Sequence, residues 1–160
     1  MTEIPKLADF MRSQGRAVNK KRGDDFEALI VSELQKQGFQ VHLAVPSVKQ
    51  YRNMKTGSRG FVTKSADLFG CIDVLAFHPR ADFTLFVQAT TDKGLVKRKI
   101  ADVGQTFTTH RQSRRLEIWT LERGVPVISD LIIWRQTLTG WETLTWKLYV
   151  ATLRMTLDNG

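Results

Sequence analysis

Two stretches decide the fold: LFGCIDVLAF at 68–77 and DFTLFVQATT at 82–91. Each is a run of aliphatic and aromatic residues with the length of a single strand. The turn sequence HPRA lies between them. The pair therefore predicts an antiparallel hairpin of largely buried strands, and the rest of the chain is arranged around it.

Upstream of this hairpin the pattern predicts one helix and one strand. Apolar residues recur at helical spacing over 24–37, and a glycine follows. Apolar residues then alternate over 39–45, and the strand that this indicates is stopped by Pro46. The segment 1–22 is expected to be an arm or short helix, ending in an exposed linker, AVNKKRG. A single domain is expected over 23–160.

Downstream, the pattern predicts a second helix and three more strands. The helix is expected to start at Asp92 and stop at Gly104, with Leu95, Ile100 and Val103 facing inward. Strands are expected over 114–121, 130–138 and 142–153, the last two joined by a turn at Gly140. The order predicts an α/β fold with an αβββαβ core and a C-terminal β-hairpin extension.

The composition narrows the class of protein. The 160 residues include one cysteine, Cys71, which excludes an internal disulfide framework and a thiolate zinc cluster. No apolar run approaches the roughly 18 residues that cross a bilayer, and the start of the chain lacks the features of a secretory signal. We therefore expect a cytoplasmic protein that does not enter the membrane.

The charge is the unusual property. Lys and Arg number 24 against 16 Asp and Glu, which gives a net charge of +8. Five basic and no acidic residues lie in 49–64, and seven basic residues and one acidic residue lie in 93–115. Nucleic acid is the first candidate partner, an anionic membrane surface is the second, and a solvated basic face is the alternative to both. The segment 47–65 is expected to be a loop or a mobile hairpin. The candidate contacts to nucleic acid are Lys49, Tyr51, Arg52, Lys55, Arg59, Lys64, Lys93, Lys97, Arg98 and Lys99.

Asp73 is the most informative residue, because it lies in the middle of a predicted strand with aliphatic neighbours. A dry, unpaired carboxylate is costly, so this group is neutralised, paired with Arg or Lys, used to cap a loop, or placed on a metal. Gln88 lies on the next strand, and a hairpin can bring the two side by side. Their oxygens could then touch a hard cation such as Mg²⁺, or the amide could be satisfied by the backbone.

Glu27 has two interpretations. Asp24 and Glu27 have the spacing of a capping box at a helix start. At about 100° per residue, Glu27 instead lies on the flank of the apolar stripe that faces the sheet, where it could meet Asp73. The sequence leaves both interpretations open.

These residues resemble the PD-(D/E)XK nuclease superfamily. The resemblance rests on Glu27 in a first helix, Asp73 within GCIDVLA and Gln88 within VQATT, followed by a basic helix, and it covers 23–104. Holliday-junction resolvase-like members, including small phage-type proteins, are the most similar in pattern. The resemblance implies a nuclease-like domain with a restriction-endonuclease-like fold, Mg²⁺ or Mn²⁺ as cofactor, DNA as substrate and a homodimer. If the chain is phage-encoded, the compartment is the host cytoplasm.

The resemblance also implies roles for individual residues. Glu27 would match the helix acid, Asp73 the motif aspartate and Ala89 the backbone-carbonyl ligand. Gln88 lies where the family usually has Glu, which keeps an oxygen ligand and removes one negative charge. Thr90 lies where the family has Lys, so the motif cation is missing. Candidates to replace it are Lys64, Lys93 and Lys97, and Asp67 is either an extra ligand or a turn residue.

Two functions follow as hypotheses. The first is a divalent-metal-dependent endonuclease that hydrolyses phosphodiester bonds of DNA, with branched or distorted DNA as the expected form. The second is a catalytically inactive module of the same fold that binds nucleic acid or a protein partner. Gln88 and Thr90 are the residues on which the choice depends.

Overall fold

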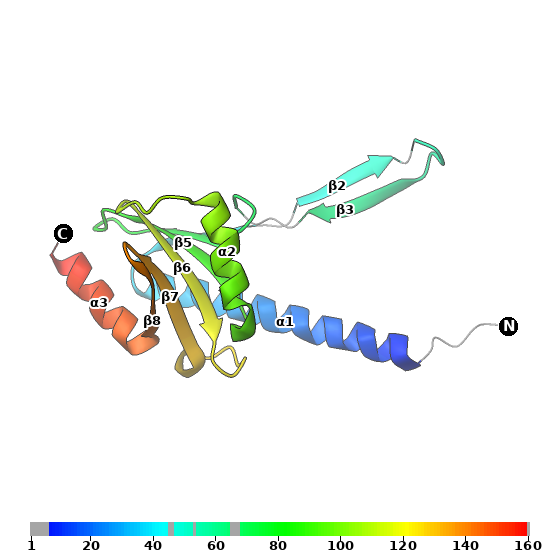
Figure 1. Cartoon of the computed structure of the whole chain (residues 1–160). Helices are drawn as coiled ribbons and strands as arrows, with labels where there is room; N and C mark the ends of the chain where they lie inside the picture. Colours follow the sequence, from blue (N-terminus) through cyan, green and yellow to red (C-terminus); the bar gives the residue numbers. More distant parts are fainter. Residues whose placement is uncertain (1–6, 45–46, 53, 65–67, 160) are drawn as a thin grey trace.

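The computed structural model describes residues 7–44, 47–52, 54–64 and 68–159. In these ranges the chain forms a mixed α/β fold with a six-stranded sheet, three α-helices and a separate two-stranded hairpin (Figure 1). The elements are α1 (Leu7–Lys36), β1 (Gln40–Leu43), β2 (Ser47–Arg52), β3 (Arg59–Lys64), β4 (Val74–Phe77), β5 (Thr84–Thr90), α2 (Val96–Thr106), β6 (Arg114–Leu121), β7 (Leu131–Thr137), β8 (Gly140–Thr145) and α3 (Trp146–Asp158), with short 3-10 turns η1 (Lys93–Leu95) and η2 (Ile128–Asp130).

The six-stranded sheet has the order β1-β4-β5-β6-β7-β8. Neighbouring strands are antiparallel, except that β5 and β6 are parallel and are connected through α2. The predicted hairpin of β4 and β5 is confirmed, with Val74 opposite Val87. This register also places the residue before Val74 beside the residue after Val87.

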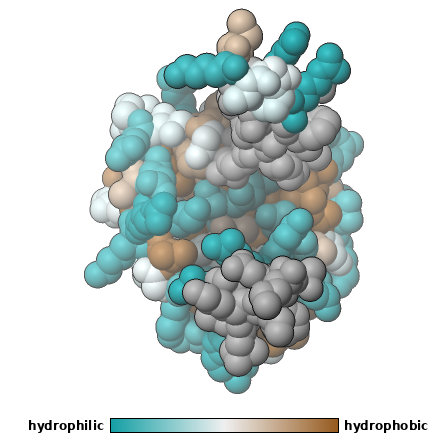
Figure 2. Space-filling model, turned by 90° about the vertical axis from the view of Figure 1, so that its right-hand side faces the viewer, coloured by the Kyte–Doolittle hydropathy of each residue, from teal (hydrophilic) through white to brown (hydrophobic). Residues whose placement is uncertain are grey.

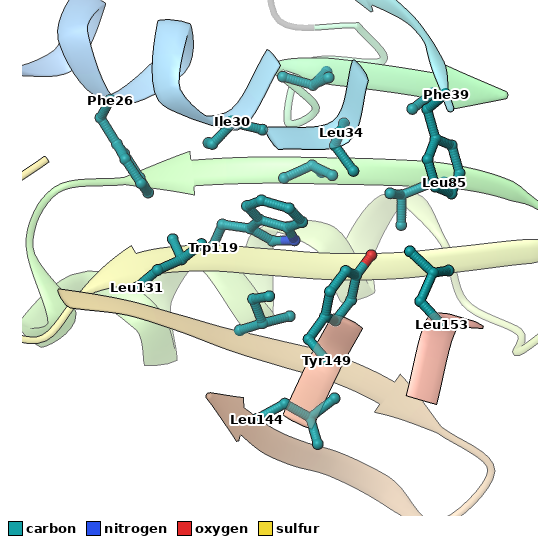
Figure 3. Packing of buried hydrophobic residues seen from close by; sticks show 14 of the residues in the cluster. Phe26, Ile30, Leu34, Phe39, Leu85, Trp119, Leu131, Leu144, Tyr149 and Leu153 are labelled. Carbon is teal, nitrogen blue, oxygen red and sulfur yellow. The ribbon is translucent and has the colours of Figure 1, made fainter. Parts of the chain in front are cut away.

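Helices cover both faces of this sheet. Phe26, Ile30 and Leu34 of α1 pack with Leu85 of β5 in the main hydrophobic core (Figure 3). The same core includes Tyr149, Leu153 and Leu157 of α3, together with the fully buried Trp119 of β6. A second cluster on α2 and the opposite side of the strands contains Ile72, Val103, Phe107 and Leu116, with Phe86 packed against it.

The predicted linker at 17–23 is wrong. These residues lie inside α1, which runs without a break from Leu7 to Lys36. AVNKKRG contains no proline, and Ala, Lys and Arg are good helix formers, while a single glycine costs only about 1 kcal/mol in a helix. Residues 14–21 are exposed, so this half of α1 continues as a helix without packing into the core.

The predicted strand at 142–153 is also wrong beyond its first part. The chain is a strand as far as Thr145 and a helix from Trp146. Alternating apolar residues suggested a strand, but the buried residues of α3 are Tyr149, Leu153 and Leu157, which are spaced four apart. The side chain of Thr145 caps this helix by accepting a hydrogen bond from the backbone N–H of Leu148 at 3.5 Å.

The second helix differs from the prediction in its details. Asp92 caps the short 3-10 turn η1 rather than α2, since its side chain accepts a hydrogen bond from the backbone N–H of Gly94 at 2.8 Å and α2 begins only at Val96. Leu95 is exposed rather than inward, since η1 precedes the α-helix and Val96 takes the buried position. Gly104 does not stop the helix, which continues to Thr106.

The basic segment 47–65 forms the hairpin alternative of its prediction. Strands β2 and β3 pair only with each other in the described residues, with Arg52 opposite Arg59. The hairpin extends away from the six-stranded sheet (Figure 1). Pro46 and Ser65, which were expected to bound it, lie outside the described residues.

Candidate metal and nucleic-acid site

Asp73 lies directly before β4 rather than in the middle of a strand, which corrects the prediction. The chain reaches it through a tight turn in which Phe69 and Gly70 have positive φ angles of 58° and 78°. Its backbone already belongs to the ladder: its N–H donates to the carbonyl of Val87 at 2.9 Å, and its carbonyl accepts from Ala44 N–H at 2.8 Å. Its side chain is consequently fixed at the point where β4 begins and β5 ends.

Gln88 and Asp73 are in direct contact. The Nε2 group of Gln88 donates to Oδ2 of Asp73 at 2.5 Å and to the carbonyl of Ala89 at 3.0 Å. The backbone N–H of Ala89 donates to the same Oδ2 at 2.6 Å. Three residues that the sequence proposed as metal ligands therefore meet in one half-buried cluster at the end of β5.

The oxygen of the Gln88 amide, Oε1, lacks a hydrogen bond in the described residues. Gln88 is 2% exposed, and its Oε1 is buried without a hydrogen-bond partner in the described part of the chain. A buried polar atom without a partner costs about 1–3 kcal/mol. The same amide turned end for end would present Oε1 to the oxygens of Asp73 and Ala89. Three oxygens facing one another would repel, unless a cation lay between them.

The residue that replaces the motif lysine has a structural role. Thr90 is 8% exposed and lies at the end of β5. Its hydroxyl donates to the carbonyl of Asp92 at 3.3 Å and lies 3.4 Å from the N–H of the same residue. The hydroxyl thus holds the turn between β5 and η1.

Glu27 is a half-buried residue of α1. The capping-box interpretation is wrong, because α1 begins at Leu7 and both Asp24 and Glu27 lie well inside it. Its neighbour Phe26 packs in the core beneath α1 (Figure 3). The α1 helix covers the face of the sheet that carries Val87, whereas Gln88, the next residue in the strand, points to the opposite face.

The candidate basic residues fall into three groups. Lys93 is engaged in an exposed ion pair with Glu122, at 2.6 Å from Nζ to Oε1. Lys97 and Arg98 are exposed on α2, and Lys99 is half-buried there. On the hairpin, the side chains of Arg52, Lys55 and Arg59 are exposed. The side chains of Lys49, Tyr51 and Lys64 lie outside the described residues, as does Asp67 entirely.

A pocket that the sequence did not reveal lies near the carboxyl ends of β5 and β6. Its volume is about 340 Å³, and Arg22, Lys93 and Arg123 are among the residues that line it. Arg22 lies four residues before the buried Phe26, and residues at this spacing share one face of a helix. This spacing was the sequence signal that Arg22 lies on the side of α1 that faces the sheet. Figure 2 shows the right-hand side of the molecule as drawn in Figure 1, where much of the described surface is hydrophilic.

Among the described residues, no three His, Cys, Asp or Glu side chains cluster closely enough to hold a metal ion. Any cation at Asp73 would therefore depend on amide and carbonyl oxygens as well as one carboxylate.

No helix in the described part of the chain is both long and apolar enough to cross a membrane. In comparisons with known proteins, no family model, no curated protein and no solved structure matches this chain.

Proposed function

We propose that the protein is a divalent-metal-dependent endonuclease that acts on DNA, with branched or distorted DNA as the expected form. The observation that carries the proposal is the contact of Gln88 with Asp73 and with the carbonyl of Ala89. These are one carboxylate, one amide and one backbone carbonyl, and each group has an oxygen of the kind that Mg²⁺ and Mn²⁺ bind, although the amide here presents its Nε2. With the inserted β2–β3 hairpin left aside, the order α1-β1-β4-β5-α2-β6 also supports the αβββαβ core that the resemblance implies.

The donor set fits a cation in one further respect. The orphaned Oε1 of Gln88 is an acceptor that the described residues leave unused, and a cation would use it if the amide turned. When bound there, Mg²⁺ or Mn²⁺ would stabilise charge on a phosphodiester and lower the pKa of a water molecule. With one carboxylate in the set, we expect weak metal binding, because hard cations are held mainly by ligand charge.

The residues of the chain itself have three tasks in this proposal. Asp73 supplies the negative charge, and the N–H of Ala89 fixes the orientation of its carboxylate. The exposed Lys97 and Arg98 on α2 and the exposed arginines of the β2–β3 hairpin contact phosphates. Symmetric oligomers are common, and a homodimer would place two such sites on one DNA molecule.

A second function is favoured by Thr90. Its hydroxyl is used in the turn with Asp92, and the lysine of the resembling family is absent from this position. The second proposal is therefore a non-catalytic module of the same fold that binds nucleic acid through its basic surfaces. Its affinity would fall with salt by about 0.9 log unit per log unit of salt for each neutralised phosphate.

The test compares Asp73→Asn with Asp158→Asn, a matched loss of one carboxylate charge at an exposed site on α3. Each protein is incubated with plasmid and with a labelled four-way junction, in Mg²⁺, in Mn²⁺ and in EDTA. We expect metal-dependent cleavage by the wild type and by Asp158→Asn. Cleavage by Asp73→Asn should fall by about 100-fold or more.

The outcomes separate the two functions. Cleavage that survives Asp73→Asn unchanged contradicts this site, because the carboxylate is its one charged donor. If no protein cuts any substrate with either metal, while salt-sensitive binding persists in Asp73→Asn, the binding module is the correct function. Circular dichroism of both variants checks that each remains folded.

A further inference from the structure

A cavity at the opposite end of the sheet carries a second concentration of positive charge. It lies where β5 and β6 begin, five residues back along β5 from Gln88, or about 16 Å at 3.3 Å per residue. Its volume is about 390 Å³, which falls within the usual range of small-ligand pockets. Four arginines line it, together with Asp82 and Phe83: Arg111, Arg114, Arg115 and Arg135.

The charge of this lining is strongly unbalanced. Four arginines face one aspartate, Asp82. Arg135 is neutralised by ion pairs with Glu117 at 3.2 Å and Glu142 at 3.6 Å. The described part of the chain gives Arg111, Arg114 and Arg115 no ion pair of this kind. The cavity is therefore positive even after its internal pairs are counted.

Aromatic rings hold two of these guanidinium groups in place. Arg115 lies over the ring of Phe83, 3.7 Å from the centroid, and Arg114 lies over Phe107 at 4.6 Å. A stacked guanidinium keeps its N–H groups free for a ligand in the plane of the stack. Arg114 also donates to the carbonyl of Thr109, which further restricts its position.

Several donors in this cavity lack acceptors. Nε of Arg114, Nη1 of Arg115 and Nη2 of Arg135 are buried, and none has a hydrogen-bond partner in the described residues. Arg135 is only 8% exposed. Burial also lowers the pKa of Arg115, because its charge is poorly solvated there. Each orphaned donor carries a cost, which an anionic ligand with several oxygens would remove if the guanidinium group turned that donor toward the cavity.

We infer that this cavity binds a phosphate group. Donors from three guanidinium groups on two strands suit an anion with several oxygens better than a flat carboxylate, which is satisfied by one arginine fork. The volume exceeds that of a bare phosphate and leaves room for part of the molecule that carries it. The phosphate belongs either to a small nucleotide or to the end of a nucleic-acid strand, and the inference does not rest on the proposed nuclease activity.

The experiment uses calorimetric titration of the whole protein with inorganic phosphate, with AMP, and with a short single-stranded DNA bearing either a 5′-phosphate or a 5′-hydroxyl. Arg115→Gln is the test variant, and Arg154→Gln on α3 is its control, because it removes the same charge from an exposed site outside the cavity. We expect at least a tenfold loss of phosphate affinity in Arg115→Gln and wild-type affinity in Arg154→Gln.

The other titrations identify which kind of molecule carries the phosphate, and the control variants exclude general effects of charge or folding. A preference for the 5′-phosphorylated strand over its 5′-hydroxyl twin supports a strand end, and tight binding of AMP with no such preference supports a free nucleotide. If Arg115→Gln does not fold, Arg114→Gln takes its place. Equal losses in the test and control variants, or no saturable binding of phosphate or AMP, overturn the inference. Asp73→Asn should bind phosphate normally, which separates this cavity from the metal site.

Discussion

The side-chain amide of Gln88 can face Asp73 and Ala89 with either its nitrogen or its oxygen. In the structure its Nε2 satisfies Asp73 and Ala89, at the expense of its own buried Oε1. A glutamate at this position would have no N–H to offer. Without a cation it would place a second carboxylate against the first, and like charges at this distance are strongly unfavourable.

We predict that Gln88→Glu makes stability dependent on metal. Without divalent cations the melting temperature should fall, since two carboxylates then face each other. With Mg²⁺ or Mn²⁺ it should rise by more than in the wild type, because the added charge strengthens ion binding. Thermal scanning with and without each cation measures both shifts. Gln105→Glu, an exposed change on α2, should respond like the wild type, and the same response in Gln88→Glu would contradict the site.

Glu117 and Arg135 form the buried ion pair of the sheet. Glu117 is 1% exposed and accepts from Nε of Arg135 at 3.2 Å and from Nε1 of Trp119 at 2.8 Å. Burial raises the pKa of Glu117 above its ordinary value of 4.5, while the charge of Arg135 and the hydrogen bond from Trp119 act in the other direction. Relative to the unfolded chain, Glu117 contributes stability below pH 4.5, and this contribution is lost as pH rises through the folded pKa.

Arg135→Met should therefore destabilise the protein in a pH-dependent manner. At neutral pH it leaves a buried carboxylate without its cation, at a cost of about 3–5 kcal/mol. The loss should shrink as pH falls toward 4.5, because the raised pKa lets Glu117 take up a proton above that value. Urea unfolding at the two pH values measures the difference. Adding Glu117→Gln to Arg135→Met should recover much of the stability at neutral pH, and a pH-independent loss would show that the pair is not the cause.

At the scale of the element, the start of α3 shows where sequence patterns fail. Alternating residues around Trp146 have strand periodicity, yet the same stretch also has apolar residues four apart from Tyr149 onward. The structure resolves the ambiguity in favour of the helix, in which Tyr149 is fully buried with its ring centroid 5.5 Å from that of Trp119. The spacing of apolar residues along the chain does not reveal a contact with a distant strand. By contrast, the bounds of β6 at 114–121 were predicted to the residue.

Thr145→Ala should weaken α3 at its first turn. The hydroxyl of Thr145 accepts the N–H of Leu148, and loss of such a cap costs about 1 kcal/mol. Chemical unfolding measures the change in free energy. Thr152→Ala is the comparison, since its hydroxyl donates to a carbonyl inside the same helix and alanine is the better helix former there. A loss as large in Thr152→Ala would mean that capping is not responsible.

Asp130 organises the loop between β6 and β7. Burial alone would raise its pKa, but hydrogen bonds from the Arg123 side chain and from the N–H groups of Val125 and Arg123 lower it below 3.8. A lowered pKa stabilises the fold above the unfolded value, and this contribution is lost as pH falls through the folded pKa.

Asp130→Asn should cost about 1–3 kcal/mol at pH 7, because charge-assisted hydrogen bonds are replaced by weaker ones. The gap to the wild type should close as pH falls from 3.8 through the lowered pKa of folded Asp130, where the wild-type carboxylate becomes protonated as well. Unfolding curves at pH 7 and at acid pH give the comparison. Arg123→Gln should lose less, since the Arg123 side chain is 72% exposed; an equal loss would assign the effect to the ion pair alone.

At the scale of the whole molecule, the basic hairpin is the surface to test for binding. A triple variant, Arg52→Gln, Lys55→Gln and Arg59→Gln, removes three exposed charges near its turn. We expect weaker DNA binding and a salt slope reduced by about 0.9 for each phosphate that the variant no longer neutralises. Filter binding across a salt series measures this slope. The matched triple at Arg80, Lys147 and Arg154, all exposed, should keep the wild-type slope, and equal slopes in both triples would contradict a role for the hairpin.

The sequence predicted the central strands of the sheet better than the N-terminal helix and the cavity at the start of β5 and β6. The β4–β5 hairpin and the contact of Asp73 with Gln88 follow from local patterns and pairing rules. The continuous α1 did not, because a glycine and several charges look like a linker when no tertiary information is present. The arginine cavity was invisible for another reason: Arg115 and Arg135 lie twenty positions apart and meet only through strand pairing.

The position of the hairpin has a mechanical consequence. The β2–β3 hairpin is connected to the sheet at two points, and both lie next to Asp73 in the chain or in space. One is Ala44, whose N–H donates to the carbonyl of Asp73, and the other is the turn closed by Leu68 and Ile72. If DNA binds the hairpin as proposed, a force along the bound strand would reach the described chain at Ala44 and at Leu68, on the two sides of the Asp73 carboxylate. Tension on the DNA would then change the geometry of the proposed metal site.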